Sequence, residues 1–218
     1  MKRTKTSRAW MREHVTDSYV KRAVAEGYRS RAAYKLLEID RRDHLFRRGA
    51  TVVDLGAAPG GWSQVAAQAV GRGGCVVAVD LLEMPALASV RFIRGDFRDP
   101  DCVMELTRIL ADREVDLVLS DMSPNISGIA AIDQARICEL AAAACEFAGK
   151  YLKPQGIFVV KLFNGEGFEA FRESMREVFE QVHVRKPGAS RDRSREVYLL
   201  GKNRHSGAFD AQGSNNDD

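Results

Sequence analysis

Apolar and amphipathic segments alternate along this chain of 218 residues. Three short segments, Thr51–Leu55, Cys75–Val79 and Val115–Ser120, are nearly continuous apolar runs, as expected for parallel strands that are covered on both faces. Further strands are predicted at Val90–Ile93, Gly156–Leu162, Gln181–Val184 and Glu196–Leu200. Helical periodicity predicts helices between the strands, at Gly61–Val70, Val103–Ala111, Ile132–Tyr151 and Phe168–Val178.

This alternation predicts the fold class. Strands that alternate with helices of this length form βαβ units and an open parallel sheet. The last two predicted strands follow each other without room for a helix, so we expect them to form a hairpin at one edge. The predicted fold is α/β: a Rossmann-like, mostly parallel seven-stranded sheet with one antiparallel edge strand and helices on both faces.

Length and periodicity predict the domain boundaries. A chain of this length suits one domain, which we place at residues 1–202. Within it, residues 1–28 form a basic N-terminal extension, and a helical period follows over Ser30–Asp40, with Ser30 as the expected N-cap. Residues 203–218 are polar and lack periodicity, so we expect a disordered tail there.

Charge is distributed unevenly, although its net value is only +3. Residues 1–48 hold 14 basic residues against 6 acidic ones, whereas the remaining 170 residues hold 19 basic and 24 acidic ones. A basic segment on an acidic body is typical of a polyanion-binding surface. Solvated helix faces give the same pattern, so charge alone leaves both interpretations open.

The sequence disfavours membrane and metal-binding classes. No apolar run reaches the roughly 18 residues of a membrane span, and the charged N-terminus lacks the apolar core of a secretory signal. The four cysteines show neither a CxxC pair nor a zinc-type spacing, so we expect small core residues and no metal site. We therefore expect a cytoplasmic protein without a membrane partner.

The strongest local motif is the turn after the first strand, DLGAAPGGW at residues 54–62. Small residues such as Gly56 and Gly60 let a ligand approach the backbone closely at the carboxyl edge of a sheet. Pro59 interrupts the G-x-G-x-x-G dinucleotide fingerprint and removes an N–H group that would hold a pyrophosphate. The turn is either only a tight loop or the site of a ligand without phosphates, such as S-adenosylmethionine.

Acidic residues after the next two strands extend this pattern. Asp80 lies 24 residues after Gly56, where a carboxylate holds a ribose diol by two hydrogen bonds. Asp96 is placed to accept from an adenine amino group, and Phe97 to flank the ring. Each acid alone is commonly a strand-end cap, but the three features together predict a nucleoside site.

The fourth and fifth strands carry candidate catalytic residues. Asp121 ends the fourth strand, and the sequence that follows it lacks the Pro-Pro-aromatic and Pro-Cys motifs of base methylation. Lys161 lies inside the apolar fifth strand, where an unpaired ammonium is costly. It is either a structural lysine that reaches out from the strand end, or a base whose pKa is lowered by burial and by a second cation such as Lys35. Glu196 opens the last strand and is expected to orient the amines.

Five separated blocks resemble the FtsJ/RrmJ-type ribosomal RNA 2′-O-methyltransferase family: SRAAYKLLEID, VVDLGAAPGGWSQVA, DLVLSDMSPNISG, VVKLFNGEGF and KPGASRDRSREVYLL. The resemblance covers about residues 15–201 and implies the class I methyltransferase fold, with S-adenosylmethionine as cofactor. It implies a Lys-Asp-Lys-Glu catalytic set at Lys35, Asp121, Lys161 and Glu196. The implied cofactor-binding residues are Gly60, Trp62, Asp80, Asp96 and Asp121, to which the arguments above add Gly56 and Phe97.

The resemblance also implies a reaction and a partner. The reaction is methyl transfer to a ribose 2′-hydroxyl, on a uridine in the A loop of 23S ribosomal RNA within the large ribosomal subunit; DNA lacks this hydroxyl. We expect a monomer whose phosphate contacts are Arg3, Lys5, Arg8, Arg12, Lys21, Arg22, Arg29, Arg31, Arg191 and Arg193. Three alternatives stay open: a tRNA 2′-O-methyltransferase of the same family, an NAD-type oxidoreductase, and a non-catalytic RNA-binding module.

Overall fold

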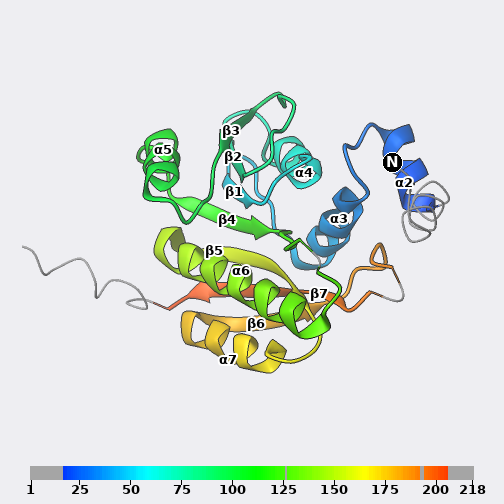
Figure 1. Cartoon of the computed structure of the whole chain (residues 1–218). Coiled ribbons are helices and arrows are strands. Elements are labelled where there is room, and N and C mark those ends of the chain that lie inside the picture. Colours follow the sequence, from blue (N-terminus) through cyan, green and yellow to red (C-terminus); the bar gives the residue numbers. More distant parts are fainter. Residues whose placement is uncertain (1–16, 126, 192–193, 206–218) are drawn as a thin grey trace, which may run out of the picture.

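The computed structural model describes residues 17–125, 127–191 and 194–205. In these ranges, seven strands form one sheet in the order β3-β2-β1-β4-β5-β7-β6 (Figure 1). The strands are β1 (Thr51–Leu55), β2 (Cys75–Asp80), β3 (Val90–Arg94), β4 (Val115–Ser120), β5 (Leu152–Phe163), β6 (Phe179–Arg185) and β7 (Glu196–Arg204). The predicted α/β class and all seven predicted strands are confirmed.

The two last strands form the predicted antiparallel hairpin at one edge of the sheet. The reversed strand β7 lies second from that edge, between β5 and the outermost strand β6. Its pairing with β5 sets Tyr198 opposite Lys161 and Glu196 opposite Phe163. The hairpin therefore brings the start of β7 beside the end of β5, where the candidate lysine lies.

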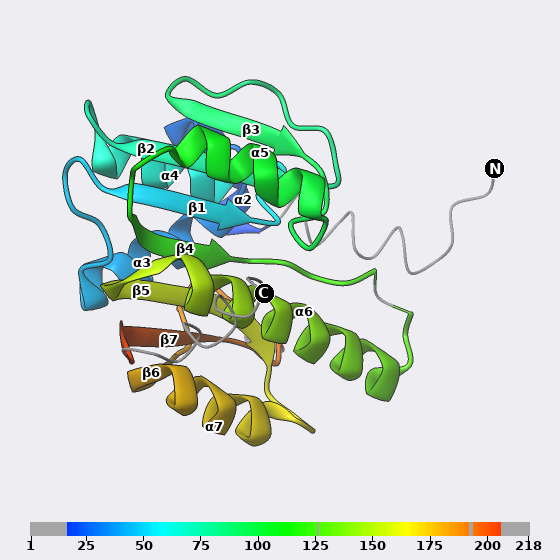
Figure 2. The ribbon, with the colours of Figure 1, turned by 90° about the vertical axis from the view of Figure 1, so that its left-hand side faces the viewer.

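Helices cover both faces of the sheet (Figure 2). Helices α3 and α4 share one apolar core with one face, while α5, α6 and α7 share a second core with the other face. The helices of the described residues are α2 (Ser18–Glu26), α3 (Ala32–Asp43), α4 (Gly61–Val70), α5 (Pro100–Leu110), α6 (Ala130–Tyr151) and α7 (Phe168–Val178).

The continuous apolar runs of the central strands follow from this layering. Successive strand residues point to opposite faces, so Val52 packs with α3 and α4, whereas Val53 packs with α5, α6 and α7. In β4, Leu117 and Val118 divide in the same way. All four side chains are at most 1% exposed, and full burial of each stabilises the fold by about 1.5–3 kcal/mol.

Helix α2 is an element that the sequence analysis did not predict. The Asp17 carboxylate caps its first turn by accepting from the Tyr19 N–H at 3.0 Å, and Gly27 ends it with a φ of 75°. Both are ordinary helix signals, but they stand in a segment that its charges marked only as a basic extension. Residues 1–16 of that extension lie outside the described residues.

Two boundary predictions were wrong. Helix α3 begins at Ala32, and Ser30 is not its N-cap; the Ser30 hydroxyl is buried with no hydrogen-bond partner among the described residues. It packs instead against the start of α4, where a Cβ on Gly61 would lie 2.3 Å from the Ser30 Oγ. At the other end, β7 continues past residue 202 because Arg204 pairs with Phe179. Residues 206–218 of the predicted tail lie outside the described residues.

The cysteines are core residues, as predicted. Cys102 and Cys145 are buried, and Cys75 and Cys138 are partly buried; all four are free thiols. Burial raises the pKa of Cys145 to about 12, so this thiol is unreactive. Within the described ranges, no helix is long and apolar enough to cross a membrane.

Candidate active site

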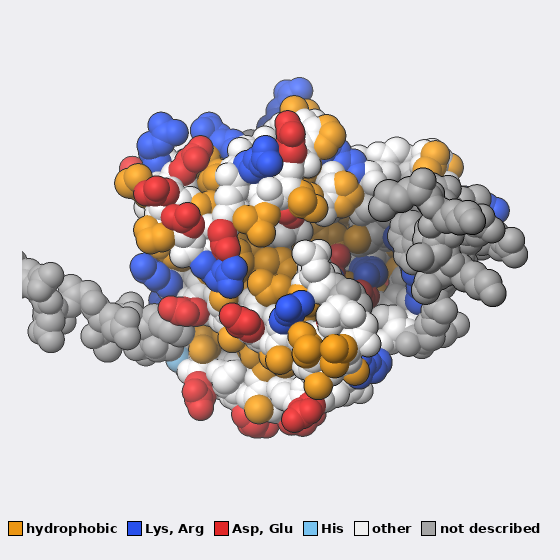
Figure 3. Space-filling view, viewed as in Figure 1, with side chains coloured by type: hydrophobic (Ala, Val, Ile, Leu, Met, Phe, Trp, Pro, Cys, Tyr) orange, Lys and Arg blue, Asp and Glu red, His pale blue; other side chains and the backbone are white. Residues whose placement is uncertain are grey.

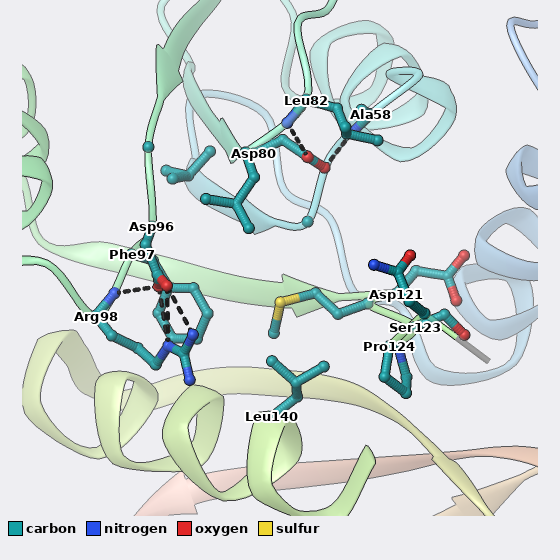
Figure 4. A pocket seen from close by; sticks show the side chains of 16 residues that line it. Ala58, Asp80, Leu82, Asp96, Phe97, Arg98, Asp121, Ser123, Pro124 and Leu140 are labelled. Carbon is teal, nitrogen blue, oxygen red and sulfur yellow. Dashed lines mark hydrogen bonds and ion pairs between the residues drawn. The ribbon is translucent and has the colours of Figure 1, made fainter. Parts of the chain in front are cut away.

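The carboxyl ends of β1, β2 and β4 border a cavity of about 420 Å³. Figure 3 shows the hollow, with apolar side chains exposed inside it. Its wall contains Asp121 and four more of the predicted cofactor-binding residues, namely Gly56, Asp80, Asp96 and Phe97. Leu140 of α6 lines the same cavity (Figure 4), and so does Met122, which follows Asp121. The sequence analysis predicted a role for neither of them.

The glycine turn shapes one side of the cavity. Gly56 has a φ of +75°, and a Cβ added there would lie 2.1 Å from the Met122 Cγ. Gly60 has a φ of +100° and stands at the start of α4. Both positions need glycine, because other residues rarely adopt this backbone conformation. The close approach of the turn to Met122 is the physical reason for Gly56.

Asp80 is fixed by the backbone around it. Its Oδ2 accepts from the Ala58 N–H at 2.8 Å, and its Oδ1 accepts from the Leu82 N–H at 2.7 Å (Figure 4). Each carboxylate oxygen still has a lone pair for a further donor. The cavity wall thus offers an oriented carboxylate at the end of β2, as the ribose-binding prediction requires.

Asp96 and Phe97 lie together after β3. The Arg98 guanidinium binds Asp96 at 2.9 Å and 2.7 Å, and this hydrogen bonding lowers the pKa of the carboxyl group (Figure 4). Phe97 is 7% exposed and packs edge-on against Phe147 at 6.3 Å between ring centroids. The cavity thus has an aromatic wall here, while the adenine contact of Asp96 stays a prediction.

Asp54 is a buried acid that the sequence analysis did not single out. It is 1% exposed and accepts from the Ser63 hydroxyl at 2.5 Å through Oδ2, while its Oδ1 has no partner among the described residues. Burial, with the charges of Asp121 and Asp80, raises the pKa of Asp54 to about 7. Asp54 thus lies behind the cavity wall and interacts electrostatically with two of its carboxylates, Asp80 and Asp121.

Lys161 and Asp121 form the first ion pair of the site. The Lys161 Nζ lies 3.1 Å from the Asp121 Oδ1 and donates to the Asp121 carbonyl oxygen at 2.6 Å. Burial raises the pKa of Asp121, but the charges of Lys161 and Lys35 and a hydrogen bond from Tyr198 outweigh it, so the pKa is lowered overall. Neighbouring strands β4 and β5 bring this pair together.

Lys35 and Glu196 form the second pair. The Lys35 Nζ lies 2.7 Å from the Glu196 Oε1 and 2.8 Å from its Oε2. The two residues are 161 positions apart, and each side chain is only 12% exposed. The Ser190 hydroxyl donates to the same Oε1 at 3.0 Å. An oriented, shielded ammonium group therefore stands on α3, facing the start of β7.

Tyr198 joins the two pairs, and the sequence analysis missed it. Its hydroxyl donates to the Asp121 Oδ1 at 2.8 Å, and its ring lies 5.9 Å from the Lys35 Nζ. Burial, followed by the Asp121 charge, raises the pKa of Tyr198 well above its ordinary value, so the phenol stays a neutral donor. Tyr198 lies opposite Lys161 in the pairing of β7 with β5. A correct alignment of these two strands would have been needed to identify it from the sequence.

Two predicted cofactor residues do not line the cavity. Trp62 is 3% exposed, donates its indole N–H to the Ala32 carbonyl at 2.8 Å, and packs on Tyr198 at 5.5 Å between ring centroids. Gly60 lies under Met84 and Arg29. In this structure both residues support the site from behind, and their contact with a cofactor stays a prediction.

Two predicted phosphate contacts are used inside the protein. The Arg29 guanidinium donates to the carbonyls of Pro85 and Ala86, both at 2.6 Å, and to that of Pro59 at 3.3 Å. Arg31 binds the Asp17 carboxylate and the Ala189 carbonyl. Arg29 thus ties the loop after β2 to the glycine turn, a positional role that charge counting does not reveal.

The other predicted phosphate contacts divide into two sets. Lys21 and Arg22 are exposed on α2, and Arg22 pairs with Glu26 at 2.6 Å. Arg191 lies 3.6 Å from Asp17. Outside the described residues are Arg3, Lys5, Arg8, Arg12 and Arg193.

Among the residues that are described, no group of three His, Cys, Asp or Glu side chains is arranged to hold a metal ion.

Comparisons with known proteins agree with this geometry. The sequence profile of the FtsJ-like methyltransferases matches residues 28–204. Ribosomal RNA large subunit methyltransferase E of Azoarcus sp. (strain BH72) is 61% identical over 201 residues, which cover 92% of this chain and 98% of the relative. Its namesake in Dechloromonas aromatica (strain RCB) is 57% identical over 202 residues, covering 93% and 98%.

A solved structure supports the same assignment. A ribosomal RNA methyltransferase of Plasmodium falciparum has a TM-score of 0.74 and 29% sequence identity, and the match covers 81% of this chain and 98% of that chain. The region matched by the profile, residues 28–204, includes both ion pairs and the whole cavity wall. This chain is therefore an enzyme that belongs to the FtsJ-like methyltransferase family.

Proposed function

We propose that this enzyme uses S-adenosylmethionine to methylate a ribose 2′-hydroxyl of large-subunit ribosomal RNA, on a uridine in the A loop of 23S ribosomal RNA. The observation that carries the proposal is the convergence of two lysine–acid pairs beside a nucleoside-sized cavity. Relatives that are 61% and 57% identical are named for methylation of large-subunit ribosomal RNA, which supports the same substrate class.

The cavity fits S-adenosylmethionine in shape and charge. Its volume of about 420 Å³ lies within the range of small-molecule sites. The oriented Asp80 carboxylate suits a ribose diol, and Phe97 supplies an aromatic wall for a base. The Asp80 and Asp121 carboxylates in the cavity wall favour a cationic ligand. When bound, the sulfonium group supplies an electrophilic methyl group.

Lys161 is the base in the proposed mechanism. In the proposed reactive state the Lys161 amine is neutral, with two N–H groups and one lone pair. Its contacts with the Asp121 carboxylate and carbonyl then use both N–H groups. The lone pair is then free to take the proton of the attacking hydroxyl as the O–C bond forms. The resulting ammonium group is stabilised by the Asp121 carboxylate until its proton passes to water.

Lys35 has a different task, because Glu196 holds its ammonium group on both carboxylate oxygens. An ammonium group in this position can donate to the ribose oxygens. Alignment of the hydroxyl with the methyl group supplies several kcal/mol of the rate enhancement, and general base catalysis supplies about 10²–10⁴-fold. The four residues thus combine orientation with proton removal.

Substitution of Lys161 tests the proposal. Large ribosomal subunits from a deletion strain serve as substrate, and 2′-O-methyl groups are mapped after incubation with S-adenosylmethionine. Lys161→Ala is expected to reduce kcat by about 10³-fold or more, while calorimetry shows unchanged S-adenosylmethionine binding. A variant with nearly normal kcat contradicts the assignment of the base.

The same assay separates the alternatives. Methylation of tRNA in place of the large subunit contradicts the proposed substrate, and thermal stabilisation by NAD but not by S-adenosylhomocysteine contradicts the proposed cofactor. Replacement of the exposed Lys21 together with Arg22 should flatten the salt dependence of RNA binding if α2 contacts phosphates.

A further inference from the structure

The segment between β6 and β7 contacts the Lys35–Glu196 pair through one hydroxyl group. The Ser190 Oγ donates to the Glu196 Oε1 at 3.0 Å, and the Lys35 Nζ lies 2.7 Å from this same oxygen. Ser190 is 6% exposed and Glu196 is 9% exposed, so water contributes little to holding the carboxylate. The Glu196 Oε1 thus has two donors, the Lys35 ammonium group and the Ser190 hydroxyl.

The hydroxyl itself is held in a fixed place. The Ser190 N–H closes a turn onto the Pro187 carbonyl at 3.0 Å. The preceding residue, Ala189, is fully buried against Ala23 of α2 and Tyr34 of α3. Because Ala189 is sealed between two helices, Ser190 cannot move without opening this small apolar cluster.

Polar contacts fix the same turn to α3. The Ala189 N–H donates to Glu38 at 3.1 Å and 3.3 Å, and Arg31 donates to the Ala189 carbonyl. Lys35 and Glu38 are three residues apart, so they lie on the same face of the helix. Helix α3 therefore fixes both ends of one chain of contacts, which runs from Lys35 through Glu196 and Ser190 back to the helix.

We propose that Ser190 is a positioning residue of the methyl-transfer reaction, whose hydroxyl fixes the Glu196 carboxylate and thereby the place of the Lys35 ammonium group. The inference rests on the proposed function. Without the hydroxyl, the Glu196 carboxylate loses a buried donor and gains rotational freedom, so the ammonium group that it holds spends less time at the ribose. Ser190 itself is not among the residues that line the cavity.

Steady-state kinetics of Ser190→Ala tests the inference. Loss of a buried hydrogen bond to a charged group predicts about a tenfold or larger fall in kcat. The KM for the ribosomal particle and the affinity for S-adenosylmethionine should change by less than about twofold, because an orienting contact acts mainly in the transition state. Ser174→Ala, on the remote helix α7, is the matched control and should retain wild-type kinetics.

A second variant guards against misfolding. Ser190→Cys keeps the approximate volume but replaces the hydroxyl by a weak donor, so it should show the same kcat defect as Ser190→Ala. The calorimetric stoichiometry for S-adenosylmethionine gives the folded fraction, to which each rate is normalised. A normal kcat in both variants overturns the inference.

A double-mutant cycle shows whether Ser190 acts through Glu196. In the background of Glu196→Ala, the further change Ser190→Ala should alter kcat by less than about twofold, since the hydroxyl has lost its acceptor. Losses that multiply in the double variant overturn the inference, because Ser190 then acts by another route. A wild-type enzyme that leaves the 2′-hydroxyl unmethylated refutes the proposed function itself and the inference with it.

Discussion

The two halves of the site are built in different ways. The cofactor half uses residues that follow β1, β2 and β3 within about 45 positions, and backbone N–H groups orient its Asp80 carboxylate. The catalytic half draws on α3, β4, β5 and β7, and its Lys35–Glu196 pair spans 161 positions. The cofactor half is thus encoded locally, whereas the catalytic half exists only when the sheet is complete.

Asp121 belongs to both halves, so its substitution should impair catalysis and cofactor binding together. It lines the cavity, binds Lys161 and accepts from Tyr198. Asp121→Ala should lower kcat by about 10²-fold or more and also weaken S-adenosylmethionine binding, as measured by single-turnover methylation and calorimetry. Asp121→Asn keeps the acceptor for Tyr198 and should bind the cofactor better than Asp121→Ala. Loss of only one of the two properties would mean that the halves are independent.

Gly56 tests the local half alone. Gly56→Ala places a Cβ 2.1 Å from the Met122 Cγ and also strains a backbone with φ of +75°. Gly49→Ala is a matched control, because Gly49 has a φ of +78° but no atom within 4 Å of the added Cβ. Gly49→Ala should lose about 1 kcal/mol of unfolding free energy, and Gly56→Ala should lose more, because Met122 must also move. Only Gly56→Ala should lose S-adenosylmethionine affinity, by about tenfold or more; equal affinities would contradict the steric argument.

Substitution of Arg29 tests whether the N-terminal segment supports the cofactor half of the site. Its guanidinium holds the Pro85 and Ala86 carbonyls, next to a loop whose residues Leu81 and Leu82 line the cavity. Arg29→Ala should therefore weaken S-adenosylmethionine binding about three- to tenfold, measured by calorimetry. Lys21→Ala, on the exposed face of α2, is the comparison and should leave this affinity unchanged. A loss of RNA affinity alone in Arg29→Ala would restore its role as a phosphate contact.

Asp54 should make the stability of the folded protein depend on pH, and this effect is the smallest of those predicted. Burial raises the pKa of Asp54 from 3.8 to about 7, above that of the unfolded chain. The folded state thus binds the proton more tightly, so this contribution to stability is complete below about pH 4 and is lost as the pH rises through 7. Asp54→Asn should gain thermal stability relative to wild type between pH 5 and pH 8. The exposed Asp112→Asn is the control, and parallel profiles for wild type and Asp54→Asn would refute the prediction.

Local signals predicted much of the structure. Nearly continuous apolar runs identified β1, β2 and β4, because both faces of these central strands are buried. The turn around Gly56 and the strand-end acid Asp80 were found because a cofactor turn is read from spacing along one short stretch. Helix α2 was missed although its caps, Asp17 and Gly27, are visible in the sequence, since charge dominated the interpretation of that segment.

Long-range contacts escaped the sequence because they depend on strand order. The sequence analysis did not single out Tyr198, because only the pairing of β7 with β5 shows that it lies opposite Lys161. The fold gives Arg29 and Arg31 backbone carbonyl partners far along the chain, while their contact with phosphate stays a prediction. Charge counting has no access to such partners.

The sequence by itself determined the α/β fold, because the apolar period is a property of neighbouring residues. It also predicted the turn around Gly56 from motif spacing, and the two amines and two acids from the family resemblance. The tertiary structure decided the geometry of the two pairs, with Lys161 3.1 Å from Asp121 and Lys35 2.7 Å from Glu196. It also decided that Tyr198 and Ser190 hold these pairs from behind. The physical reason is that a buried charge must be paired with a group that is close in three dimensions, whatever their separation along the chain. The strand order of the sheet determines which groups are close.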